Sequence, residues 1–208
     1  MEWCIYMDKV HVSAMAALLM GVLYFFDDTG ILSAVLPAVL IHEAGHMLTL
    51  WLFGAKLTRL HILVSGLKMD YSGNLSPLEE FISALAGPGF GLIYAWITSA
   101  LGMKLGSEYL LCSSGVSFIL SIFNLLPAAP IDGGICLGFV LSVFISKDQP
   151  ELIEKIVFIS GLFISLAMFA AGIFLAFEGL GLGLVSAAVW IFLLSCKDTC
   201  KNIELRIK

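Results

Sequence analysis

The sequence predicts an α-helical polytopic membrane protein with about six transmembrane helices, a small β-hairpin after the second helix and a broken fourth span. Of its 208 residues, 60% are hydrophobic and only 13% are charged, and the mean hydropathy is +1.00. Soluble domains carry about 25% charged residues. The low charge, the long apolar runs and an uneven distribution of Lys and Arg together indicate several membrane crossings.

The helical spans are predicted from apolar runs, because about 20 helical residues are needed to cross about 30 Å of hydrocarbon. Six runs qualify, and they lie near residues 11–26, 31–53, 79–101, 109–146, 155–177 and 180–196. The fourth run exceeds a single crossing, and its Asn124–Gly134 stretch holds two prolines and two glycines. We therefore expect this span to follow a broken and partly extended path.

The topology follows from the positively charged residues. If the broken run crosses once, both termini are cytoplasmic, and ten of the eleven Lys and Arg residues share that side, with Lys104 alone outside. If it crossed twice, seven of the eleven would lie outside. Six crossings are therefore predicted. Unwound backbone at membrane depth must be buried in protein or line a wet cavity, so residues 124–134 should line a site.

Residues 57–73 differ from the rest of the chain, because they are rich in strand-forming residues around Ser65-Gly66 and lack helical periodicity. This pattern predicts a β-hairpin. The sequence leaves two roles open for it. It is either a surface connector or an edge strand that pairs with an extended substrate.

The segment His-Glu-Ala-Gly-His at 42–46 places two imidazoles and a carboxylate inside the second apolar run. Residues four apart share a helix face, so His42 and His46 can aim at one zinc ion while Glu43 lies beside it as a general base. The alternative is a chance match. It carries a penalty, because a charged side chain at mid-bilayer costs roughly 2.5–3.5 kcal/mol.

A catalytic zinc usually has three protein ligands, so two histidines require another donor. Asp132 is the strongest candidate, because it lies in the broken segment, where proline and glycine can hold its carboxylate at a fixed point.

Two motifs in the same order make the chain resemble the site-2 protease family of intramembrane metalloproteases. They are His-Glu-Ala-Gly-His at 42–46 and Asn-Leu-Leu-Pro-Ala-Ala-Pro-Ile-Asp-Gly-Gly at 124–134. The triplet Ala86-Gly87-Pro88 is also similar to the family pattern, whereas Gly89-Phe90-Gly91 departs from it where family members often have Asn. This departure concerns local helix packing and not the metal site.

The resemblance implies one Zn²⁺ per chain held by His42, His46 and Asp132, with Glu43 as base. It also implies that Asn124 lies near the reacting peptide as a polar positioning or oxyanion group. An interhelical hydrogen bond is the structural alternative for Asn124. The compact sequence looks most like the bacterial branch that processes sporulation sigma factors.

The domain prediction is a single membrane-embedded protease domain over 1–208, with a catalytic core at 31–146 and two further transmembrane helices within 155–196. Neither a PDZ module nor a nucleotide-sensing domain is expected. The predicted location is the bacterial cell membrane. The predicted partners are the lipid bilayer, a transmembrane or membrane-associated protein substrate and, as an option, a separate regulatory membrane protein.

Other functions remain as alternatives. A metal or ion transporter also uses intramembrane His, Glu and Asp, but no inverted internal repeat is evident. A catalytically silent binding protein of the same fold is the second alternative. Nucleic-acid binding is not expected, because the formal net charge is -5 and the Lys and Arg residues form no basic stripe.

Overall fold

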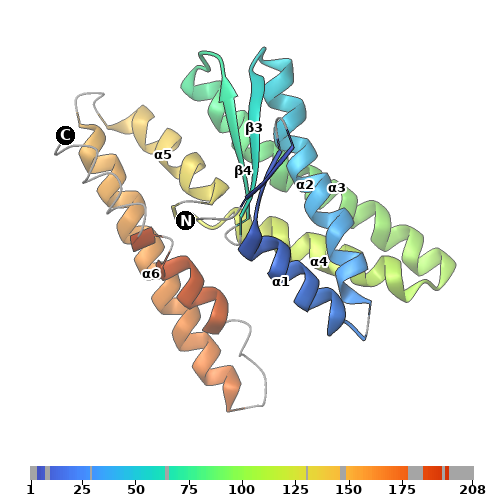
Figure 1. Ribbon diagram of the computed structural model, residues 1–208. Helices are drawn as coiled ribbons and strands as arrows, with labels where there is room; N and C mark the ends of the chain where they lie inside the picture. Colours follow the sequence, from blue (N-terminus) through green and yellow to red (C-terminus); the bar gives the residue numbers. More distant parts are fainter. Residues whose placement is uncertain are drawn as a thin grey trace. The chain divides into compact units, whose positions relative to one another are not determined.

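The computed structural model describes residues 4–7, 10–28, 30–63, 66–129, 131–145, 149–177, 185–193 and 195–196. It divides into two compact units, Met1–Ile122 and Phe123–Lys208. Figure 1 shows the helices and strands of both units. The division falls inside the predicted catalytic core, 31–146, so each unit is described by itself.

The first unit contains a four-stranded sheet in the order β1-β2-β3-β4. β1 (Cys4–Met7) pairs antiparallel with β2 (Val10–Ser13), β2 pairs parallel with β3 (Lys56–Leu63), and β3 pairs antiparallel with β4 (Gly66–Ser72). The hairpin predicted within residues 57–73 is therefore confirmed as β3 and β4. The two strands before it were not predicted. Among the described strands, β4 is an edge strand with β3 as its neighbour.

The apolar run at 11–26 begins as strand β2 and continues as α1 (Ala14–Phe25). The Oγ of Ser13 accepts a 3.1 Å hydrogen bond from the amide of Ala16 and so caps the helix. With 12 residues, α1 extends about 18 Å, which is shorter than the hydrocarbon layer. A helical span over the whole run 11–26 was expected. The helix instead begins at Ala14, because the residues before it pair in the sheet.

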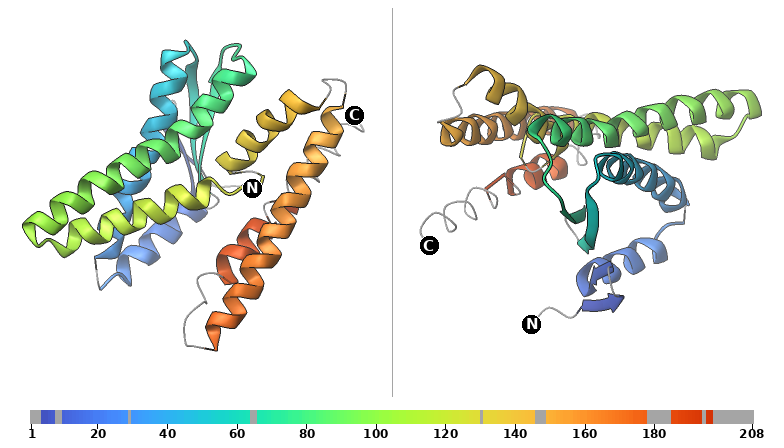
Figure 2. Two further views of the ribbon diagram at one scale, coloured as in Figure 1. Left: turned by 180° about the vertical axis from the view of Figure 1, so that it is seen from behind. Right: turned by 90° about the horizontal axis from the view of Figure 1, so that it is seen from above.

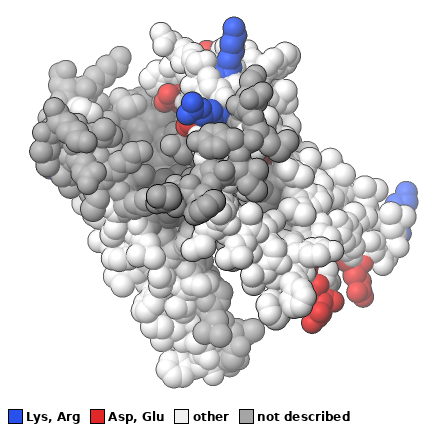
Figure 3. All heavy atoms as spheres, viewed as in Figure 1, with Lys and Arg blue, Asp and Glu red and all other residues white. Residues whose placement is uncertain are grey.

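Three described helices are long and apolar enough to cross a membrane: α2 (Ile31–Leu52), α3 (Pro77–Leu105) and α6 (Pro150–Ala176). Two shorter apolar helices are α4 (Glu108–Asn124) and α5 (Asp132–Phe144). Figure 3 shows one face on which uncharged atoms predominate and charged side chains form small groups. These features indicate a membrane protein.

The ends of the long helices in the first unit are fixed by local capping. The carboxylate of Asp27 accepts hydrogen bonds from the amides of Ile31 and Leu32, at 3.0 and 2.6 Å, at the start of α2. Ser76 and Glu79 form a capping box at the start of α3. Helix α3 ends at Leu105 and is followed by Gly106, whose φ of 64° lies in the left-handed region that glycine tolerates.

Small residues let α3 and α4 approach closely, and Figure 2 shows the two helices side by side. Serines on α4 donate to main-chain carbonyls of α3: Ser114 to Ala95 at 2.8 Å and Ser117 to Gly91 at 2.9 Å. The hydroxyl of Ser113 reaches the carbonyl of Ala34 on α2 at 3.0 Å. Glycine and serine contacts of this kind are typical of membrane bundles, where the hydrophobic effect does not drive helices together.

In the second unit, residues 125–129 and 131 are described as non-helical and separate α4 from α5. The predicted break at 124–134 is confirmed but is narrower, because Asp132 and the two glycines after it form the first turn of α5. Side chains at these glycines would collide with main-chain atoms of the break, at Leu125 and Leu126 for Gly133 and at Ala128 and Ala129 for Gly134. Glycine is therefore required for α5 to begin so close to it.

Candidate metal centre

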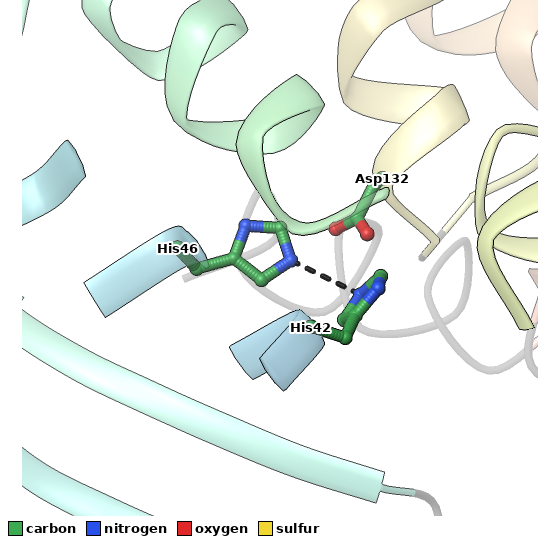
Figure 4. A group of neighbouring side chains, drawn as sticks. All are labelled: His42, His46 and Asp132. Atoms are coloured by element: carbon green, nitrogen blue, oxygen red, sulfur yellow. Dashed lines mark hydrogen bonds between the residues drawn. The ribbon is translucent and has the colours of Figure 1, made fainter. Parts of the chain in front are cut away.

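Helix α2 carries the His-Glu-Ala-Gly-His segment, and its two histidines lie one turn apart on a buried face. His42 is 4% exposed and His46 is 9% exposed. Their Nε2 atoms are 3.3 Å apart, and the ring centroids are separated by 4.9 Å. Figure 4 shows the two imidazoles turned toward each other. The predicted common helix face for the two histidines is therefore present.

The separation of the two nitrogens fits a shared zinc ion. Two ligands at the usual Zn–N distance of about 2.0–2.1 Å, with a tetrahedral angle between them, are about 3.3–3.4 Å apart. The observed separation of 3.3 Å between Nε2 of His42 and Nε2 of His46 agrees with this value. The histidine pair could therefore bind one ion without a large movement of either ring.

A main-chain carbonyl of the neighbouring helix orients His46. Its Nδ1 lies 2.7 Å from the carbonyl oxygen of Ser83 on α3. A carbonyl can only accept, so Nδ1 carries a proton, and in the neutral ring Nε2 then offers its lone pair. Sequence reasoning missed Ser83, because a serine in an apolar helix gives no sign that its carbonyl faces a histidine.

Thr49 strengthens the same part of the α2–α3 contact. Its Oγ1 lies 3.0 Å from the carbonyl oxygens of both Gly45 and His46, and 3.3 Å from the Oγ of Ser83. The threonine therefore connects the end of the histidine segment with the part of α3 that accepts the hydrogen bond from His46.

Glu43 follows His42 on α2 and is half-buried. Asn124, the last residue of α4, and Asp132, in the first turn of α5, are also half-buried. The N-terminus of a helix favours a carboxylate, because its free amides and dipole carry partial positive charge. Among the described residues, His42, His46 and Asp132 are the group of side chains that could hold a metal ion, and all three are drawn in Figure 4.

The break before Asp132 is held in place within the second unit. The hydroxyl of Ser160 on α6 donates to the carbonyl of Pro127 at 2.6 Å, and that of Ser195 donates to the carbonyl of Ala129 at 2.8 Å. Ala128, between them, is fully buried. These contacts satisfy main-chain groups of the break and fix the backbone from which Asp132 projects.

The other histidines lie in the sheet. His11 and His61 are cross-strand partners in β2 and β3, with ring centroids 5.3 Å apart. Nε2 of His61 is 2.9 Å from Oδ2 of Asp70. These residues do not belong to the candidate ligand group found among the described residues.

No family model matches the sequence. Among solved structures, the site-2 protease from Methanocaldococcus jannaschii is similar, with a TM-score of 0.69 and 18% identity, over 95% of this chain and 94% of that one. Among curated proteins, sll0528 of Synechocystis sp., which bears the provisional name of a zinc metalloprotease, is 27% identical over 113 residues. This match covers 50% of this chain and 30% of sll0528, so it spans about a third of that relative. The chain has the site-2 protease fold, and both similarities support the resemblance predicted from its motifs.

Proposed function

We propose that this chain, which has the site-2 protease fold, is a zinc-dependent endopeptidase that cleaves membrane-embedded or membrane-associated proteins within the bilayer. The observation that carries the proposal is the buried pair of Nε2 atoms, 3.3 Å apart, on the helix that also holds Glu43. A chance match to the HExxH pattern would not require this spacing, which suits two ligands of one zinc ion.

His42 and His46 are the first two proposed ligands, and Asp132 is the third. One zinc ion per chain is expected, since three protein ligands leave one position of a tetrahedral site for the reaction. The donor group of two imidazoles and one carboxylate is a usual set for catalytic zinc. In this proposal the two units together form a single membrane-embedded protease domain.

Glu43 is the proposed general base and acid. When bound, zinc supplies the positive charge that lowers the pKa of water and polarises the peptide carbonyl. Glu43 accepts the proton of the attacking water and delivers it to the amine that leaves, so that hydrolysis yields one carboxyl and one amino terminus. Asn124 is proposed to position the peptide or to stabilise the oxyanion. Its place at the start of the helix break supports this role.

The proposed substrate is an extended segment of a membrane protein. A substrate helix must unwind first, because its carbonyls are hydrogen-bonded within the helix. β4 lies at an edge of the sheet formed by the described strands, and this edge is proposed to hold such a segment by main-chain hydrogen bonds. A separate membrane protein is proposed as a regulator of this step.

We propose a multi-pass arrangement of six crossings in the bacterial cell membrane, with both termini cytoplasmic. The three long apolar helices support several crossings. The count of six rests on the distribution of Lys and Arg and requires the 12-residue α1 to contribute the first crossing. His46 lies about 10 Å from the α2 C-terminus, which would place the metal below the membrane surface on the cytoplasmic side.

The test uses a substrate trap. Membrane proteins that co-purify with Glu43→Gln are identified by mass spectrometry, and each is then incubated with purified wild-type protein or with Glu43→Gln. Cleavage by the wild type alone supports the proposal. Zinc uptake into liposomes that contain the wild type, without cleavage of any trapped protein, would instead support a transporter.

A further inference from the structure

We propose that Ser83 and Gly87 of α3 are positioning residues for the metal ligand His46. This inference rests on the proposed function. The Ser83 carbonyl fixes the proton of His46 on Nδ1, and the missing side chain at Gly87 leaves the space that the imidazole occupies. Together they direct Nε2 of His46 to the metal.

The first observation is the tautomer that the helix contact imposes. Nδ1 of His46 donates to the Ser83 carbonyl at 2.7 Å, and this bond is buried. With its proton on Nδ1, neutral His46 has a lone pair on Nε2, which is the nitrogen that faces His42 at 3.3 Å. Ligating histidines typically donate their second nitrogen in this way, which fixes ring orientation and raises ligand basicity.

The second observation is the space at Gly87. A Cβ at this position would lie 2.7 Å from Cδ2 and 2.5 Å from Cε1 of His46, and closer still to Nε2. Real Cβ atoms do not approach other heavy atoms so closely. Any side chain at residue 87 would therefore displace the ring at the atom that binds the metal.

The two positions act together because they lie one turn apart on α3. Residues i and i+4 share a helix face, and each Cβ leans toward the helix N-terminus. A side chain at residue 87 would therefore lean over the Ser83 carbonyl. The glycine exposes this carbonyl to His46 and also makes room for the ring.

The close helix crossing depends on a second glycine, on the opposite helix. A Cβ at Gly45 would lie 2.6 Å from the carbonyl oxygen of Ala86 and 3.1 Å from Cα of Gly87. Gly45 precedes His46, so the main chains of α2 and α3 approach closely beside the histidine. This close approach of the two main chains requires glycine at position 45.

The first test is the zinc affinity of the purified full-length protein, measured by competition with a chromophoric chelator. We expect Gly87→Ala to bind zinc roughly 10–100-fold more weakly than the wild type, which is the usual loss when a partner of a ligand is disturbed. Gly89→Ala is the matched control, because a Cβ there meets no atom within 4 Å. It should bind zinc with wild-type affinity.

A second control separates ligand positioning from helix packing in general. Gly91→Ala also introduces a clash on α3, but with Ser121 of α4 and not with a histidine. We expect it to lower thermal stability while the folded protein keeps its zinc affinity. Wild-type affinity in Gly87→Ala, or an equal loss in Gly91→Ala, would overturn the inference.

The third test needs no substitution in α3. In ¹⁵N-histidine NMR spectra of the zinc-loaded protein, with His46 assigned by comparison with His46→Gln, we expect a protonated Nδ1 and a metal-bound Nε2. A proton on Nε2 of His46 would overturn the inference and leave the proposed function standing. A wild-type protein that binds no zinc would overturn the proposed function itself.

Discussion

The hydroxyl of Ser117 on α4 donates a 2.9 Å hydrogen bond to the main-chain carbonyl of Gly91 on α3. Both residues are buried, and the glycine leaves its carbonyl open to the serine. The same glycine also accommodates the Oγ of Ser121, against which any Cβ at residue 91 would collide. Gly91 belongs to the Gly89-Phe90-Gly91 stretch, where the sequence departs from the family pattern. Ser117 and Ser121 of α4 occupy the space that a side chain at residue 91 would need.

Gly91→Ala should therefore destabilise the first unit. Overpacking of a tight contact typically costs about 1–3 kcal/mol, and we expect a lower midpoint of thermal unfolding in detergent. Adding Ser121→Ala should restore most of the loss, because the Cβ of residue 121 lies 3.6 Å from the new methyl group, an ordinary contact. An unchanged midpoint in Gly91→Ala, or no recovery in the double variant, would contradict this packing.

The sequence predicts the histidine face well because a helix has one fixed period. The four-residue spacing of His42 and His46 determines that they share a face wherever the helix lies. The hairpin is also local, since β3 and β4 are neighbours in the sequence. The non-helical break is predicted because Pro127 and Pro130 disfavour a continuous helix.

The remaining features are non-local. β2 pairs in parallel with β3, although two helices separate them in the chain, and no local pattern specifies such a partner. The shortened first helix follows from this pairing. The contacts of His46 with Ser83 and of Gly87 with the imidazole depend on how two helices cross, which residue types alone do not reveal.

Zinc content should separate the proposed ligands from the proposed base. We expect Ala at His42, His46 or Asp132 to abolish stoichiometric zinc, because each change removes one of three protein ligands. Glu43→Gln should keep about one zinc per chain and lose proteolysis, because Glu43 acts on the proton and not on the metal. Metal analysis of the purified variants checks this. Stoichiometric zinc in the triple Ala variant would exclude the site.

The orientation of α6 tests the single broken crossing. Gln149 precedes α6 and is exposed, and the six-crossing arrangement places it in the cytoplasm. A Cys at Gln149, in a variant without native cysteines, should react with a membrane-impermeant maleimide only after the cells are permeabilised. Lys104→Cys is the control at an exposed site that should react in intact cells. Labelling of residue 149 in intact cells would require a second crossing.

The tail after Cys196 is expected on the same cytoplasmic side as Gln149, and it lies outside the described residues. The described strands allow a direct test of substrate binding. β4 is an edge strand, whereas β3 is paired on both sides by β2 and β4.

If substrate adds to β4, its binding depends on main-chain donors of that strand. Alternate residues of an edge strand direct their N–H groups toward the paired strand or away from it. We therefore expect Pro substitutions at Leu67, Lys68 and Met69 to alternate in effect. Where the native N–H faces β3, the Pro variant should have a lower thermal stability, because a hydrogen bond within the sheet is lost. Where the native N–H faces outward, the Pro variant should have wild-type stability and zinc content but strongly reduced cleavage. Ala at the same positions should have little effect, because side chains add only modest selectivity. Wild-type cleavage of a trapped substrate by every stable Pro variant would exclude strand addition and leave the hairpin as a connector.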